Sequence, residues 1–270
     1  MLRMLTLGAR LVRAALALVY PGRCAACDAL VATDDAAFCD ACTLSLVPIA
    51  RSCPSCARPL PAATTQPPPC IGCLQRRPLY DGALATFEFG GAIAQAIRRL
   101  KWSQLPELAA PLGRLLEETW ARAPPSYRAI DLIVPVPLHP KRLREREFNQ
   151  AAVLARALKS AAKARAEDEL ARVDALVRGQ DAARAKIRVD TRALSRVRNT
   201  PPQTGLGIDQ RRRNVIGAFV VRDPRRVRDR NVLLVDDVLT TGATADACAS
   251  ALYKAGAASV LVLTLGRAVT

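Results

Sequence analysis

The stretch NVLLVDDVLTTGATADACASAL, residues 231–252, joins a buried strand, an acidic pair and the start of a helix. Residues 232–235 are an apolar run suited to a strand buried on both faces, as in a parallel sheet. Residues 245–255 have a helical pattern, and Gly256 follows as a stop signal. The residues between strand and helix therefore lie where open α/β sheets place their ligands.

A short loop of threonines and a glycine leads into this helix. Its members are Thr240, Thr241, Gly242, Ala243 and Thr244. Hydroxyls and closely spaced backbone N–H groups at a helix N-terminus form a cradle for a phosphate dianion. Asp236 and Asp237, just before the loop, would repel a phosphate but suit sugar hydroxyls or a hydrated Mg²⁺. This order predicts a sugar phosphate as the ligand.

Three other interpretations of the stretch explain it less well. The Gly-x4-Gly-Lys-Ser/Thr order of a Walker A loop is missing, and so is the GxGxxG dinucleotide fingerprint. A plain N-capped helix that follows a strand by chance explains Thr244 but not the acidic pair and the loop together.

Strand and helix patterns alternate through the chain after residue 79. Strands are expected at 83–89, 129–137, 215–221, 231–235 and 259–265, and helices at 93–101, 106–123 and from 148 onward. This alternation predicts an α/β domain with a mainly parallel sheet. The long helical pattern is charged beyond Lys159, so residues from about 160 to 186 are expected to form an exposed insertion.

Eight of the nine cysteines form four CxxC pairs. They are Cys24, Cys27, Cys39, Cys42, Cys53, Cys56, Cys70 and Cys73. Each pair can form a knuckle with two thiolates directed at one metal, and two knuckles complete a tetrahedral zinc site. Disulfides and a redox-active CxxC fit this pattern less well, because no convincing signal peptide precedes it and no thioredoxin-like setting surrounds it.

The four pairs predict two zinc ions with a structural role. Protein thiolates would fill all four positions of each ion and leave none for a substrate. Sequential and interleaved pairings of the knuckles both satisfy the spacing. Cys248 lies in an Ala-rich helical pattern and is expected to be a small core residue.

The chain has 270 residues and a formal net charge of +16, which favours anionic partners such as phosphorylated metabolites, nucleic acid or a membrane surface. Residues 1–22 fit an amphipathic helix, and Arg10 and Arg13 interrupt what would be the core of a signal peptide. No apolar window reaches the roughly 18 residues that span a bilayer. We expect a cytoplasmic protein without a transmembrane segment.

The motif VLLVDDVLTTGAT resembles the 5-phosphoribosyl-1-diphosphate (PRPP) signature of type I phosphoribosyltransferases. With the cysteine pairs, RRLKW, VPVPLHPKRLREREFNQA, RNTPPQTGL and QRRRNVIGAF, nearly the whole chain resembles the ComF family. The resemblance implies a double zinc ribbon at 23–78 and a phosphoribosyltransferase-like domain at 79–270. Where the family usually has Gly, this chain has Glu147, so a turn with positive φ would be strained there.

The resemblance also implies roles for individual residues. Asp236 and Asp237 would bind the ribose hydroxyls, and residues 240–244 would hold the 5-phosphate. Further substrate contacts are expected from Pro135, Val136, Pro137, Lys101, Arg198, Thr200 and Gln203, with Arg142 and Arg196 as additional candidates. The only histidine, His139, is expected to end a strand rather than to act as a base.

The resemblance implies a protein that binds PRPP with Mg²⁺, and transfer of the phosphoribosyl group would release pyrophosphate. The family is linked to DNA uptake in natural transformation. The alternative is therefore a non-catalytic protein of the competence machinery that senses PRPP or handles single-stranded DNA, with a helicase as partner at the inner face of the membrane. Aromatic residues make up only 4% of the chain, whereas stacking platforms for single strands need them.

Overall fold

The computed structural model describes residues 22–31, 33, 36–61, 67–103, 105–127, 129–172, 187–200 and 208–269. The expected helix at 1–22 and Gln203 lie outside these residues, apart from Gly22. The elements, in chain order, are α2 (Asp40–Thr43), α3 (Ile71–Gln75), β1 (Gly82–Glu88), α4 (Gly91–Trp102), η1 (Pro106–Leu108), α5 (Ala109–Ala121), η2 (Pro125–Tyr127), β2 (Leu132–Pro135), α6 (Pro140–Arg146), α7 (Gln150–Arg172), β3 (Arg188–Val189), β4 (Ser195–Arg196), α9 (Ile208–Val215), β5 (Phe219–Val220), η3 (Pro224–Arg226), β6 (Asn231–Leu239), α10 (Ala243–Lys254) and β7 (Ser259–Arg267).

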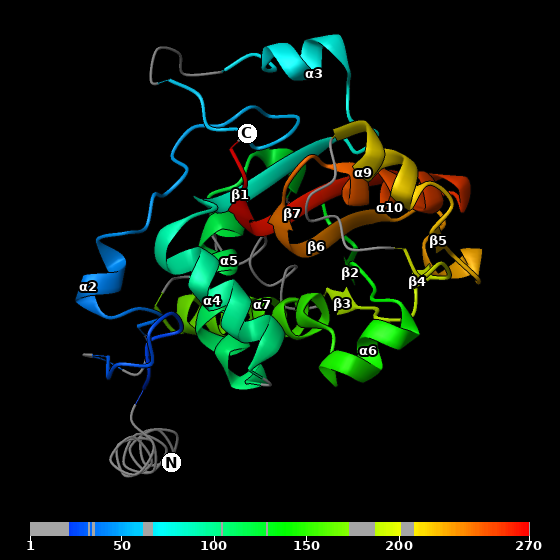
Figure 1. Ribbon diagram of the computed structural model, residues 1–270. Helices are drawn as coiled ribbons and strands as arrows, with labels where there is room; N and C mark the ends of the chain where they lie inside the picture. The colour runs from blue at the N-terminus through cyan, green and yellow to red at the C-terminus, as the bar shows by residue number, and fades with distance from the viewer. Residues whose placement is uncertain are drawn as a thin grey trace.

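A five-stranded sheet in the order β1-β7-β6-β2-β3 forms the centre of the body, and all its pairs are parallel. Strands β4 and β5 form a separate antiparallel pair. Residues 232–235 of β6 are completely buried, as expected for an apolar run in a parallel sheet. The order and the flanking helices (Figure 1) confirm the expected phosphoribosyltransferase-like architecture.

The sheet separates two apolar cores. On one face, α4, α5 and α7 pack together with Phe38 and Cys24 of the cysteine-rich segment. On the other face, α10 packs together with Tyr80 and Ala57. Gly113 of α5 faces α7 so closely that a Cβ there would lie 2.4 Å from the Cβ of Ala157, so the two helices need glycine at this position. None of the described helices is both long enough and apolar enough to cross a bilayer.

Three elements differ from the sequence-based expectation. The strand expected at 215–221 is only β5, Phe219–Val220, because Val215 ends α9, and β5 pairs with β4 outside the parallel sheet. The strand expected at 231–235 continues to Leu239, so the acidic pair belongs to the strand rather than to the loop. The expected insertion begins as a continuation of α7, where Ala162 and Ala166 are buried because their four-residue spacing keeps them on one face of the helix. Residues 173–186 lie outside the described part of the chain.

Helix α6 ends at Arg146, and its C-cap residue Glu147 has a φ of 64°, in the left-handed region. This is the position where the family resemblance implied strain, because only glycine adopts that region without a steric cost.

We expect Glu147→Gly to raise the free energy of unfolding by about 1 kcal/mol, because it removes the Cβ clash of the left-handed conformation. Thermal unfolding would show this as a rise in Tm of roughly 2–4 °C. Glu145→Gly, two residues earlier inside the same exposed helix, is the matched control and should lower stability by about 1 kcal/mol. Equal losses in both variants would contradict the assigned strain.

Candidate functional site

The eight N-terminal cysteines gather in two groups of four, in their sequential order along the chain. The groups are Cys24, Cys27, Cys39 and Cys42, and then Cys53, Cys56, Cys70 and Cys73. Within each group all Sγ atoms lie within 4.8 Å of one another, and the Cys27–Cys39 and Cys56–Cys70 separations are both 3.7 Å. Four thiolates about 2.3 Å from one zinc would be roughly 3.8 Å apart, whereas bonded disulfide sulfurs are about 2.05 Å apart. The two groups are therefore consistent with two zinc ions in sequential pairing.

Backbone N–H groups favour the thiolate form of one cysteine in each group. Burial raises the pKa of Cys24, but hydrogen bonds from the backbone of Cys27, Cys39 and Ala26 outweigh it and lower the pKa to about 6. Burial likewise raises the pKa of Cys53, and backbone donors including Cys70 N, 3.2 Å from its Sγ, lower it to about 7. Since zinc binds thiolates, these donors suit both groups to the metal.

Each cysteine group is tied to the body by one arginine. Arg99 of α4 donates to the carbonyl of Cys24 at 2.8 Å and pairs with Asp28 at 2.6 Å. Arg267, the last residue of β7, donates through Nε to the carbonyl of Cys56 at 2.7 Å. The guanidinium of Arg267 also donates to the carbonyls of Leu239 and Thr240, at 3.1 and 2.6 Å. One buried side chain thus connects the second cysteine group with the loop after β6.

The acidic pair lies at the carboxyl end of β6, with its two side chains on opposite faces of the sheet. Asp237 faces α4, and the Nζ of Lys101 lies 2.9 Å from its Oδ2. Beyond this ion pair, no hydrogen bond to the buried Oδ2 comes from the described residues. A ligand hydroxyl would supply a further donor.

The ionised form of Asp236 is destabilised in the folded protein. Burial raises its pKa to about 7, repulsion from Asp237 adds to the effect, and Lys101 opposes it. The backbone N–H of Asp237 donates to Asp236 Oδ1 at 2.9 Å. A carboxylate whose ionised form is destabilised in this way is stabilised most by a ligand that brings hydrogen-bond donors or a cation.

The predicted phosphate loop, residues 240–244, carries the chain from β6 into α10. Gly242 is the N-cap of α10, with φ 81°, and the Oγ1 of Thr241 accepts the N–H of Ala243, the first residue of the helix, at 3.4 Å. A Cβ at Gly242 would lie 3.1 Å from the hydroxyl of Tyr80, so both the backbone conformation and the neighbouring ring require glycine. The N-terminus of a 12-residue helix is thus presented beside the acidic pair.

Lys101, Arg146 and Arg196 interact electrostatically with the acidic pair, and Arg142 lies close to the two arginines. Arg142 donates to the carbonyl of Thr200 at 3.1 Å, and Arg196 donates to the Oγ1 of the same residue. Burial lowers the pKa of Arg146, and attraction to Asp237 and Asp236 opposes this, which places its guanidinium in the field of the pair. The same guanidinium lies 4.6 Å from the ring centroid of Trp102. With Lys101, these arginines form a positively charged rim suited to a diphosphate.

Among the other residues predicted to contact the substrate, Pro135, Val136 and Pro137 offer a ligand no backbone N–H group. The N–H of Val136 is donated to Val235, its carbonyl accepts from Asn149, and Pro135 and Pro137 have no N–H. A diphosphate bound beside these three residues would therefore have to accept its hydrogen bonds from the arginines. Arg198 donates to the carbonyl of Ile216, and the Nδ1 of His139 caps α6.

Sequence reasoning did not assign Arg146, Trp102, Tyr80 or Arg267 to the site. The sequence carried one signal for Trp102, its position directly after Lys101, and the structure shows that its side chain is 68% exposed. Arg267 had none, because its contacts with Cys56 and Thr240 depend on the folded sheet.

Comparisons with known proteins agree with this arrangement. Residues 15–74 match the model of the double zinc ribbon domain. The chain is 31% identical to the DNA utilization protein YhgH of Escherichia coli (strain K12) over 252 residues, which are 93% of this chain and 99% of that protein. YhgH of Salmonella typhimurium matches equally, with 31% identity over 252 residues. Competence protein F of Haemophilus influenzae is 28% identical over 202 residues, 74% of this chain and 78% of that protein. The chain therefore belongs to the ComF family of YhgH and competence protein F.

Proposed function

We propose that the carboxyl end of the sheet binds PRPP together with Mg²⁺. The carboxylates of Asp236 and Asp237 accept hydrogen bonds from the ribose hydroxyls. The N-terminus of α10 and the loop at 240–244 hold the 5-phosphate. The diphosphate lies toward Lys101, Arg146 and the neighbouring arginines, whose charges offset its own.

One observation supports this proposal above the others. Two carboxylates and the N-terminus of a 12-residue helix lie within eight residues of chain, and the Oδ2 of the buried Asp237 is paired with Lys101 at 2.9 Å. Acceptors for hydroxyls and a cradle for a phosphate are thus present at one end of the sheet, which is the pattern that a phosphorylated sugar requires.

We propose further that the bound PRPP donates its phosphoribosyl group. The bond between C1 and the diphosphate oxygen breaks, the diphosphate leaves with the electron pair, and a nucleophile forms the new bond to C1. Positive charge develops on the sugar while negative charge develops on the leaving group. Lys101 and the arginines stabilise the latter, and Mg²⁺ adds charge neutralisation when it is bound.

Titration of the zinc-loaded chain with PRPP and Mg²⁺ is expected to release heat and to change the fluorescence of Trp102, because Trp102 is exposed beside Lys101 whereas Trp120 is completely buried. Calorimetry and tryptophan emission, with ribose 5-phosphate and with PRPP lacking Mg²⁺ as control ligands, measure this directly. Release of pyrophosphate with nucleobases as acceptors would support transfer. Binding without release would support PRPP binding and contradict transfer, and no binding would contradict both.

Single-stranded DNA is a second candidate ligand. The net charge of +16 and the name of YhgH, a DNA utilization protein, favour it. Binding through phosphates would weaken steeply with salt. Competition between PRPP and an oligonucleotide would locate the strand at the acidic pair, whereas independent binding would locate it elsewhere.

A further inference from the structure

A cavity of about 180 Å³ lies at the amino ends of the strands, opposite to the acidic pair. Its charged lining consists of Arg188, Arg225, Arg226, Arg230, Asp131 and Asp190. Asp131 directly precedes β2, and Asp190 directly follows β3. The four arginines reach this one small cavity from the start of β3, from η3 and from the residue before β6.

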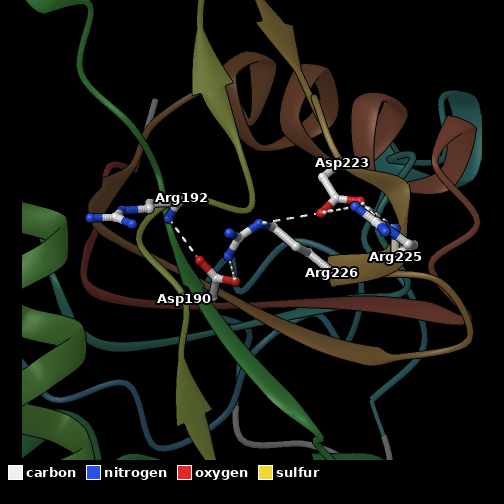
Figure 2. A network of polar contacts seen from close by, with 5 residues as sticks. All are labelled: Asp190, Arg192, Asp223, Arg225 and Arg226. Carbon is white, nitrogen blue, oxygen red and sulfur yellow. Dashed lines mark hydrogen bonds and ion pairs between the residues drawn. The ribbon is translucent and has the colours of Figure 1, made fainter.

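Arg226 is fixed in place by two carboxylates. Its Nη1 lies 2.8 Å from Asp190 Oδ2, and its Nε lies 3.9 Å from Asp223 Oδ2. Asp190 is itself 9% exposed and accepts the N–H of Arg192 at 2.8 Å. Figure 2 shows the guanidinium of Arg226 between these two carboxylates, while the side chain of Arg192 points away from them. One cation of the cavity is therefore already held in position before any ligand arrives.

The remaining charges do not cancel. Arg225 pairs with Asp223 at 2.9 Å, and Asp131 accepts from the backbone and side chain of Asn231. Arg188 and Arg230 are exposed and, among the described residues, have no carboxylate partner. The cavity thus offers two free guanidinium groups beside a fixed one.

We propose that this cavity binds a phosphate group through Arg188, Arg226 and Arg230. Guanidinium groups donate paired, parallel hydrogen bonds to phosphate oxygens, and they retain their charge at all physiological pH values. The volume is below the roughly 300 Å³ at which cavities begin to enclose a whole small ligand, so one phosphate group enters and the rest of its carrier stays outside. Free phosphate and the phosphate of a nucleic-acid strand share this chemistry.

The cavity is independent of the proposed PRPP site. Arg230 directly precedes β6 and Asp236 lies six residues further along the chain in β6, which corresponds to about 20 Å. Substitutions at the cavity should therefore leave PRPP binding unchanged, and a failure of either proposal leaves the other standing.

The test compares two double variants that remove the same charge. Arg188→Gln with Arg230→Gln removes the two free guanidinium groups, whereas Arg98→Gln with Arg192→Gln removes two exposed ones outside the cavity. Inorganic phosphate is titrated by ³¹P nuclear magnetic resonance. Oligodeoxynucleotides with and without a 5′-phosphate are titrated by fluorescence anisotropy between about 50 and 200 mM salt.

We expect the first variant to lose about 10-fold or more in affinity for a phosphate-bearing probe, and the second less than about 2-fold. A loss confined to inorganic phosphate identifies a small anion as the ligand. A loss for the oligonucleotides, with a salt slope smaller by about 1–2, identifies a strand. Equal losses in both variants, or no binding of any probe by the unsubstituted chain, would overturn the proposal.

Discussion

Replacing Cys53 with serine is expected to lower the bound zinc from two ions to one per chain and to unfold the second cysteine group. Cys53 is completely buried, and its Sγ accepts the N–H of Cys70. A structural zinc contributes about 10–16 kcal/mol of apparent binding energy, as much as the whole stability of a typical domain, about 5–15 kcal/mol. Elemental analysis and limited proteolysis of residues 51–75 measure the two effects.

The damage should extend to the proposed phosphate loop, because Arg267 joins the carbonyl of Cys56 to that of Thr240. We therefore expect Cys53→Ser to weaken PRPP binding as well as zinc binding. Cys248→Ala is the control, since Cys248 is buried in α10 away from both groups and should leave two zinc ions in place. Two zinc ions retained in Cys53→Ser would refute the assigned ligand set.

Removal of either carboxylate of the acidic pair should weaken PRPP binding, but with opposite effects on stability. Each hydrogen bond to a charged group is worth about 1.5–3 kcal/mol, so Asp236→Asn and Asp237→Asn should each weaken binding roughly 10- to 100-fold. Asp236→Asn removes a carboxylate that burial and Asp237 destabilise, whereas Asp237→Asn leaves Lys101 without its ion pair. Calorimetry with PRPP and thermal unfolding separate the two effects.

The stabilisation by Asp236→Asn should depend on pH. The folded pKa of Asp236, about 7, lies above the ordinary value of 3.8, so its ionisation costs the fold stability as the pH rises from about 4 to 7. The advantage of the variant should therefore be absent near pH 4, grow by at most about 1.4 kcal/mol per pH unit and level off above pH 7. Asp229→Asn, an exposed change at the other end of β6, should alter neither binding nor this profile. Unchanged PRPP affinity in both acidic-pair variants would remove the pair from the site.

The local features of this protein could be predicted from the sequence. The apolar run of β6 and the spacing of the CxxC pairs each have a periodic or stereotyped pattern, and both gave the correct structure. The helix after Gly242 could likewise be predicted, because a loop of small residues separates the apolar run of the strand from the helical pattern that follows. The strain at Glu147 followed from the family resemblance, and its φ confirmed it.

The remaining features depend on tertiary packing. Strands β3, β4 and β5 have two residues each, too few for a period. The sequence pointed to Lys101 but not to its partner, because the contact with Asp237 joins helix and strand across more than a hundred residues. Sequential pairing of the cysteine groups also required the fold, since the spacing alone fitted two arrangements.

The position of β7 has a consequence for the synthesis of the protein. Among the strands of the described residues β7 comes last, yet it lies between β1, which comes first, and β6. About 180 residues separate the starts of β1 and β7, and a ribosome adding about 5–20 residues per second needs roughly 9–35 s for that interval. Until β7 emerges, β1 has no neighbour in the sheet and β6 exposes an open edge, which invites pairing with other chains. The cysteine groups, complete before β1 is made, can fold during translation, whereas the sheet closes only after β7 has been made.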